Sequence, residues 1–230
     1  MLFLRSKQIL KCGKYVMAIQ IENPWAIICE GPADKAFFMR LIQERRSPNF
    51  DIIAGKGRGH FSEMLRGLRG STQARNLNAI LIVSDNDDDP ARSFGEVQNQ
   101  IQIATGYPVP ENPMQIARAE GQPAIMIMMV PWIGTPGCLE TLLRMIWQRE
   151  QEPVGVCVDE FLRCTKVTEW AIQKRDKAAI QCFIAGSNHE DPNKSLRYLL
   201  ESANNPLPMH APELDNIASA LQNFGAIVAG

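Results

Sequence analysis

The stretch Ala79–Asp89, which reads AILIVSDNDDD, constrains the fold of this chain more than any other segment. Its apolar run Ile80–Val83 is short and rich in β-branched side chains, as is typical of a strand buried on both faces of a parallel sheet. Directly after this run come four carboxylates: Asp85, Asp87, Asp88 and Asp89. Because neighbouring carboxylates repel one another, they need either open water or a cation. Ligands of open α/β sheets bind at the carboxyl ends of the strands, so the stretch predicts a divalent-metal site.

The rest of the chain alternates short apolar runs with segments of helical periodicity. Further strands are expected at 25–29, 50–54 and 124–130, with a possible edge strand near 114–117. Helices are expected at 33–45, 61–69 and 92–104, from about residue 139, and then at 156–164, 169–185, 195–202 and 213–224. Alternating strands and helices predict an α/β fold with a mostly parallel sheet and helices on both faces. From residue 154 onward the pattern is helical throughout.

This pattern divides the chain into three parts. We expect residues 1–20 to be a loosely ordered N-terminal extension, because their apolar stretches are interrupted by basic residues and are too short for a signal peptide. Residues 21–150 form the predicted α/β domain, and residues 151–230 form a helical C-terminal extension packed on it. No apolar run reaches the ~18 residues that a membrane span requires, so no membrane association is expected.

Composition is that of a globular protein, with 45% hydrophobic and 21% charged residues. The six cysteines form no CxxC pair and show no regular spacing. Buried thiols in a reduced, cytoplasmic protein are therefore expected, rather than disulfides or a zinc site.

Charge is unevenly distributed along the chain. Residues 31–80 hold nine Lys and Arg against four Asp and Glu, whereas residues 81–160 hold four against twelve. A basic flank beside an acidic pocket suits a polyanionic substrate such as a nucleic acid. An uneven but merely solvated surface is the alternative.

Carboxylates from separate segments are expected to meet at one edge of the sheet. Glu30 ends one predicted strand and Asp85 ends another, so they converge if these strands are neighbours. Asp87 is expected one pleat beyond Asp85, within reach of the same ion. Asp34 either turns back toward the site or complements the helix dipole, and Glu140 follows a Pro-Gly turn after a further strand. Oxygen ligands without His favour Mg²⁺ or Mn²⁺, and five carboxylates suit two ions about 4 Å apart.

A glycine-rich segment, Gly55–His60, follows the second predicted strand and leads into a helix. Such turns can cradle phosphate, although this spacing matches neither the P-loop nor the dinucleotide-binding motif. A contact of Lys56 or Arg58 with a phosphate or a nucleic acid is one interpretation. A flexible turn without a ligand is the other.

Three alternatives to a catalytic metal site remain open for the acidic stretch. The spacing of an EF-hand loop places ligands at Asp85, Asp87, Asp89 and Glu96, but Pro90 stands where that loop needs glycine. A solvated acidic turn that caps the helix beginning at Pro90 is the second alternative. The third is an aspartyl nucleophile of the dehalogenase-like phosphatases, although Asp88 stands where those enzymes have Thr or Val.

The residues so far resemble the Toprim domain, which topoisomerases, bacterial primases and the overcoming-lysogenization-defect (OLD) nucleases share. The resemblance rests on Glu30-Gly31-Pro32-Ala33-Asp34-Lys35 and Asp85-Asn86-Asp87, each after a predicted strand. With Gly55-Lys56, Pro136-Gly137-Cys138-Leu139-Glu140 and a helical tail, it is most similar to the OLD branch and to small stand-alone Toprim-like proteins. It covers residues 24–150. It implies a Rossmann-like sheet, one Mg²⁺ on Glu30, Asp85 and Asp87, and a second ion at Asp34 and Glu140.

The chain also departs from its relatives in this resemblance. These 230 residues hold no ATPase domain before the Toprim-like part, no zinc domain and no evident catalytic tyrosine. The OLD nucleases use a lysine beyond the last acidic motif, for which Lys166 and Lys174 are both candidates. A nucleotide site for primase-type transfer is not apparent.

The expected function is Mg²⁺- or Mn²⁺-dependent phosphodiester cleavage of DNA or RNA, with Glu30, Asp85, Asp87 and Lys56 in catalytic roles. The alternative is a metal-binding Toprim interaction module that is inactive alone and works with a partner ATPase in a two-component system. Nucleic acid is the expected partner, and a homo-oligomer is possible on either interpretation.

Overall fold

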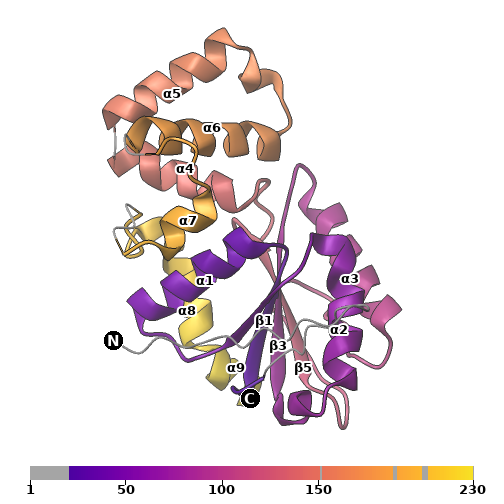
Figure 1. Cartoon of the computed structure of the whole chain (residues 1–230). Helices are drawn as coiled ribbons and strands as arrows, with labels where there is room; N and C mark the ends of the chain where they lie inside the picture. The colour runs from indigo at the N-terminus through magenta and orange to yellow at the C-terminus, as the bar shows by residue number, and fades with distance from the viewer. Residues whose placement is uncertain (1–20, 151, 189–190, 204–206, 230) are drawn as a thin grey trace, which may run out of the picture.

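The computed structural model describes residues 21–150, 152–188, 191–203 and 207–229 (Figure 1). Residues 1–20, which we expected to form a loosely ordered extension, lie outside these ranges. Within the described residues, no helix is both long and apolar enough to cross a membrane.

A five-stranded, mostly parallel sheet forms the centre of the molecule, which confirms the predicted α/β fold. Its strands are β1 (Trp25–Cys29), β2 (Asp51–Ala54), β3 (Ala79–Asp85), β4 (Ile116–Ala117) and β5 (Ala124–Val130), in the order β2-β1-β3-β5-β4. Strands β1, β2, β3 and β5 are parallel, and the short edge strand β4 is antiparallel to β5. In the pairing of β1 with β3, Ile28 lies opposite Ile82, so Glu30 leaves the sheet beside Ser84.

Helices cover both faces of the sheet and extend beyond its carboxyl end (Figure 1). The α-helices are α1 (Pro32–Arg45), α2 (Phe61–Gly70), α3 (Pro90–Ala104), α4 (Leu139–Glu150), α5 (Glu152–Cys164), α6 (Ile172–Ser187), α7 (Leu196–Glu201), α8 (Asp215–Gln222) and α9 (Phe224–Ala229). Short 3₁₀ helices are η1 (Arg58–His60), η2 (Gln73–Asn76), η3 (Val167–Glu169) and η4 (Pro212–Leu214). Helices α2 and α3 lie on one face and α1 on the other, while α4, α5 and α6 form a group at the end of the sheet.

Two hydrophobic cores explain why the central strands are apolar without alternation. Successive side chains of a strand point to opposite faces of the sheet. In β3, Ile80 and Ile82 belong to the core beneath α2 and α3, whereas Leu81 and Val83 belong to the core beneath α1. Both faces are therefore buried, as the β-branched run predicted.

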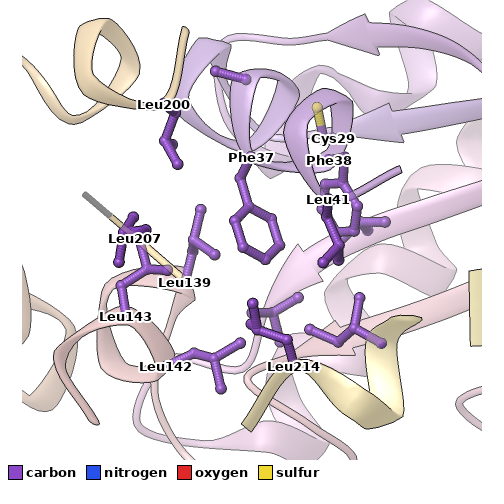
Figure 2. Packing of buried hydrophobic residues seen from close by; sticks show 14 of the residues in the cluster. Cys29, Phe37, Phe38, Leu41, Leu139, Leu142, Leu143, Leu200, Leu207 and Leu214 are labelled. Carbon is purple, nitrogen blue, oxygen red and sulfur yellow. The ribbon is translucent and has the colours of Figure 1, made fainter. Parts of the chain in front are cut away.

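The C-terminal helices share the core beneath α1 rather than forming a separate one. Figure 2 shows Phe37 and Leu41 of α1 close to Leu139 and Leu142 of α4 and to Leu214 of η4. Buried residues of α5, α6, α7 and α8 belong to the same cluster, which places α6 against the end of the α/β unit.

Several helix boundaries differ from the expected ones for identifiable reasons. The helix expected at 169–185 begins only at Ile172, whose amide donates to Asp88 Oδ1 from a loop 84 residues earlier. The helix expected at 213–224 is divided into η4, α8 and α9. At the break, the Asn223 side-chain amide donates to the Ser219 carbonyl, a local bond that competes with continuous helix.

Candidate functional site

Glu30 and Asp85 lie side by side at the carboxyl ends of β1 and β3. Glu30 Oε1 accepts hydrogen bonds from the Asp85 backbone amide at 3.1 Å and from Ser84 Oγ at 2.5 Å. The contact follows from the parallel pairing of the two strands, which confirms that they are neighbours. The sequence prediction that these two carboxylates converge therefore agrees with the fold.

Asp34 adds a third carboxylate from the first turn of α1. Its Oδ2 accepts from the Gly31 amide at 2.7 Å as part of a capping box, so it supports the helix as well as facing the site. Burial raises the pKa of Asp34 to about 6, and the negative charges of Glu30 and Glu140 contribute to the rise. Asp34 therefore does both things that the sequence left open.

Glu140 reaches the same region from the beginning of α4. The ligand atoms of Asp85, Cys138 and Glu140 all lie within 4.8 Å of one another. Asp85 Oδ1 accepts from the Leu139 amide at 3.1 Å, which fixes that carboxylate against the helix N-terminus. Burial of Cys138, together with the charges of Glu140 and Asp85, raises the pKa of its thiol, which is therefore protonated at neutral pH.

The electrostatics of Asp85 show how closely the carboxylates are grouped. Burial raises the pKa of Asp85 well above its usual value, and Glu30, Asp34 and Glu140 raise it further in that order. The four carboxylates thus come from β1, α1, β3 and α4 and interact electrostatically at one end of the sheet.

Asp87 is held in place by the turn after β3. We expected Asp87 to lie one pleat beyond Asp85 in the same strand. That expectation is wrong, because β3 ends at Asp85 and Asp87 has a left-handed φ of 50°. Between the two aspartates, Asn86 is buried and donates to the Trp132 and Thr135 carbonyls at 2.7 Å each. These bonds fasten the turn to the loop after β5.

A glycine on that loop allows it to approach the Asp87 backbone closely. The Gly137 amide donates to the Asp87 carbonyl at 2.7 Å. Gly137 has a φ of 131°, and a Cβ there would lie 2.5 Å from Thr141 Oγ1. Both the conformation and the close contact require glycine at this position.

Arg58 projects from η1 into this acidic group. Its guanidinium donates to Glu30 Oε1, Ser84 Oγ, the Asp85 carbonyl, Asp87 Oδ2 and Glu96 Oε2, at 2.6 to 3.4 Å. Only 10% of its side chain is exposed. A phosphate contact of Arg58, one of two interpretations of the glycine-rich segment, stays a prediction; in this structure its partners include three carboxylates of this region, those of Glu30, Asp87 and Glu96. Lys56 is exposed on the same glycine loop, and its expected phosphate contact stays a prediction.

A lysine that sequence reasoning missed interacts with the site from α6. Desolvation alone would lower the pKa of Lys177, but the negative charges of Glu140, Asp85, Cys138 and Glu30 outweigh it and raise the pKa. Lys166 and Lys174, the two lysines suggested by the sequence, and Lys177 are all exposed, so exposure does not distinguish them; the interactions of Lys177 with the charges of the site do.

Helical geometry contains a signal that favours Lys177 over Lys174. Lys177 borders the buried stripe of α6, whose members include Ile180 and Phe183, whereas Lys174 is on the opposite side of the helix. The sequence does not show which part of the molecule this stripe packs against. Only the packing of α6 in the folded protein shows it.

The two remaining aspartates of the acidic stretch have structural roles. Asp89 Oδ1 accepts from the Arg92 amide at the start of α3, as the helix-cap alternative predicts. Asp88 Oδ1 accepts from the Ile172 amide at the start of α6. The EF-hand alternative does not fit, because Asp85 ends a strand and Glu96 pairs with Arg58 and Arg92.

One family model matches most of the chain. It is described as "Protein of unknown function (DUF3226)" and covers residues 24–225, from β1 to α9. Neither the curated proteins nor the solved structures returned a match.

Proposed function

Because this chain belongs to the DUF3226 family, whose function is unknown, we propose a function from the site itself. The chain is a Toprim-type phosphodiesterase that cleaves DNA or RNA with Mg²⁺ or Mn²⁺. The grouping of Glu30, Asp34, Asp85 and Glu140 at one end of a parallel sheet carries this proposal. The order β2-β1-β3-β5, with β1 beside β3, agrees with the Toprim resemblance of the sequence.

The donor set suits a hard divalent cation. Four carboxylates in mutual electrostatic contact destabilise one another, as the raised pKa of Asp85 indicates. A divalent ion removes that repulsion, and carboxylate oxygens are the ligands that Mg²⁺ and Mn²⁺ prefer. Cys138 adds one thiol to four carboxylates of the same electrostatic group, so oxygen ligands dominate the donor set.

In this proposal Glu30, Asp85 and Asp87 hold one ion, and Asp34 and Glu140 help to hold a second. Bound ions of this kind activate water and neutralise the charge that develops on a phosphate. Ser84 and the Leu139 amide orient Glu30 and Asp85 through the hydrogen bonds described above. Lys177, beside Glu140 and Asp85, offers a positive charge to a phosphate oxygen, and Lys56 contacts the nucleic-acid backbone.

The direct test is nicking of supercoiled plasmid DNA, or cleavage of a structured RNA, in Mg²⁺ or Mn²⁺. Asp85→Asn should reduce the rate by about 100-fold or more, since loss of even an outer-shell partner of a metal has effects approaching that size. Asp89→Asn is the matched control, because Asp89 belongs to the same acidic stretch but caps α3. Equal rates for wild type and Asp85→Asn would refute the proposal.

A second candidate function is a Toprim module that requires a partner ATPase. The observation that favours it is apolar exposure on the helical group, where Val156, Phe161 and Trp170 are 54%, 48% and 53% exposed. Large apolar side chains that remain exposed can take part in protein interfaces. Cleavage that begins only when an ATPase encoded beside this chain is added would favour this second function over the first.

A further inference from the structure

We propose that Arg58 is a built-in counter-cation, which a divalent ion must displace from Glu30 and Asp87 in order to bind. The inference rests on the proposed metal site and adds a residue that competes with the metal. Arg58 then sets the metal concentration at which the site becomes loaded.

Arg58 contacts the same residues that are proposed to hold the first metal ion. Arg58 Nη2 donates to Asp87 Oδ2 at 2.9 Å and to the Asp85 carbonyl at 2.6 Å, and Nε is 3.4 Å from Glu30 Oε1. Glu30 and Asp87 are two of the three residues that the proposed function assigns to that ion. While the guanidinium holds Glu30 Oε1 and Asp87 Oδ2, its positive charge opposes the approach of a second cation to these carboxylates.

Arg58 and Lys177, the two basic side chains of the site, interact mainly with different carboxylates. Arg58 pairs with Glu30 and Asp87, whereas the strongest interactions of Lys177 are with Glu140 and Asp85. Displacement of Arg58 therefore concerns the first ion and leaves the surroundings of Glu140 unchanged. This division makes the inference specific to one half of the site.

Arg58 also pairs with a carboxylate that is not among the proposed metal ligands. Its Nη1 donates to Glu96 Oε2 at 2.9 Å, and the Glu96 side chain is 46% exposed. Arg58 follows Gly57, whose φ of 96° and open surroundings give the backbone freedom that other residues lack. The guanidinium can therefore leave Glu30 and Asp87 and remain near the site, paired with Glu96.

Direct measurement of Mn²⁺ binding to the full chain tests this inference. Binding is followed by the loss of the electron paramagnetic resonance signal of free Mn²⁺ and by calorimetry, so no activity is required. Arg58→Gln should bind Mn²⁺ about tenfold more tightly than wild type, the size of effect expected when one charge-assisted hydrogen-bonded competitor is removed. Arg58→Lys keeps the charge but has no planar fork, so its affinity should fall between the two.

Arg92→Gln is the matched control. Arg92 donates to the other oxygen of Glu96 at 3.0 Å but has no contact with Glu30 or Asp87. Its removal should therefore leave Mn²⁺ affinity within about twofold of wild type. Should Arg58→Gln fail to fold, the comparison of Arg58→Lys with Arg92→Gln still decides the matter.

The outcomes separate this inference from the proposed function. If wild type and Arg58→Gln bind Mn²⁺ equally, or if the variant binds more weakly, Arg58 is not a competitor, while the metal site stands. If neither protein binds Mn²⁺, the proposed metal site is itself wrong. Binding by Arg58→Gln alone would support both, because the arginine would then exclude the ion under the conditions used.

Discussion

At the scale of single residues, Asp34 and Asp85 carry the largest electrostatic strain among the carboxylates of the site. Each carboxyl is partly buried, each is surrounded by others, and each has a raised pKa. Arg58, paired with Glu30 and Asp87, and Lys177, which interacts with Glu140 and Asp85, compensate for part of the negative charge. Asp34 and Asp85 therefore have a higher proton affinity than isolated carboxylates have, and a divalent ion would compete with their protons.

The pH dependence of stability follows from these two residues. A carboxyl whose pKa is higher in the folded than in the unfolded state makes the native protein bind more protons, so stability falls as pH rises through that interval. For Asp34 the interval runs from about 4 to about 6. We expect the metal-free protein in chelator to melt a few degrees lower at pH 7.5 than at pH 5, as measured by thermal unfolding.

Two comparisons check the origin of that slope. Saturating Mn²⁺ should raise the melting temperature at pH 7.5 much more than at pH 5, because protons compete with the ion at the lower pH. Asp34→Asn should flatten the slope in chelator. If the metal-free protein instead lost stability as the pH fell from 7.5 to 5, the assignment of this pH dependence to Asp34 would be contradicted.

At the scale of elements, α6 is the connection between the C-terminal helices and the site. Its first amide bonds to Asp88 of the acidic stretch, and one turn later it carries Asp176 and Lys177. The helix is thus positioned by the same loop whose carboxylates its lysine approaches. This arrangement explains how a residue far from the acidic motifs in the sequence comes to lie beside them.

The role proposed for Lys177 gives a prediction with its control on the same helix. Lys177→Ala should lower the rate of plasmid nicking by about 100-fold, the size expected when a charge that stabilises a transition state is removed. Lys174→Ala changes an exposed residue of the same type one turn away and should leave the rate unchanged. Similar rates for the two variants would remove Lys177 from the proposed mechanism. As a control for folding, the melting temperatures of both variants should be close to that of wild type.

At the scale of the whole molecule, one core joins the helical group to the α/β unit, and an ionic network joins α4, α5 and α6 to one another. Arg144 of α4 donates to Asp176 of α6 at 2.7 Å and to Asp159 of α5 at 2.7 Å. Asp176 is only 1% exposed, so its charge depends on these partners. The expected division of the chain at residue 150 passes between helices that share this network, and that division stays a prediction.

Breaking the network should destabilise the protein as a whole. Asp176→Ala leaves Arg144 with a largely buried positive charge and one fewer partner, which we expect to lower the free energy of unfolding by about 3 kcal/mol. The exposed pair of Arg163 and Glu160 is the control, and Arg163→Ala should cost less than about 0.5 kcal/mol. Urea unfolding measures both, and a cost for Asp176→Ala as small as that of the control would show that the network does not stabilise the native state.

What the sequence by itself determined about this protein is local. The apolar runs at 25–29, 79–83 and 124–130 predict buried strands. The acidic residues that follow each of them, directly or after a short turn, predict where carboxylates meet, because parallel strands end at one edge. Glu30, Asp34, Asp85 and Glu140 could therefore be named before their distances were known.

Only the tertiary structure decided which cations face these carboxylates. The glycine-rich segment pointed to Arg58 and the helical stripe favours Lys177, but neither pattern identifies the partner of the side chain, because a helix or a loop can present a side chain to several neighbours. The bond from Ile172 to Asp88 and the packing of α6 against α4 and α5 select one of these arrangements. The burial of a strand can be predicted from its own residues. The partner of a charged side chain, in contrast, depends on contacts between segments that only folding brings together.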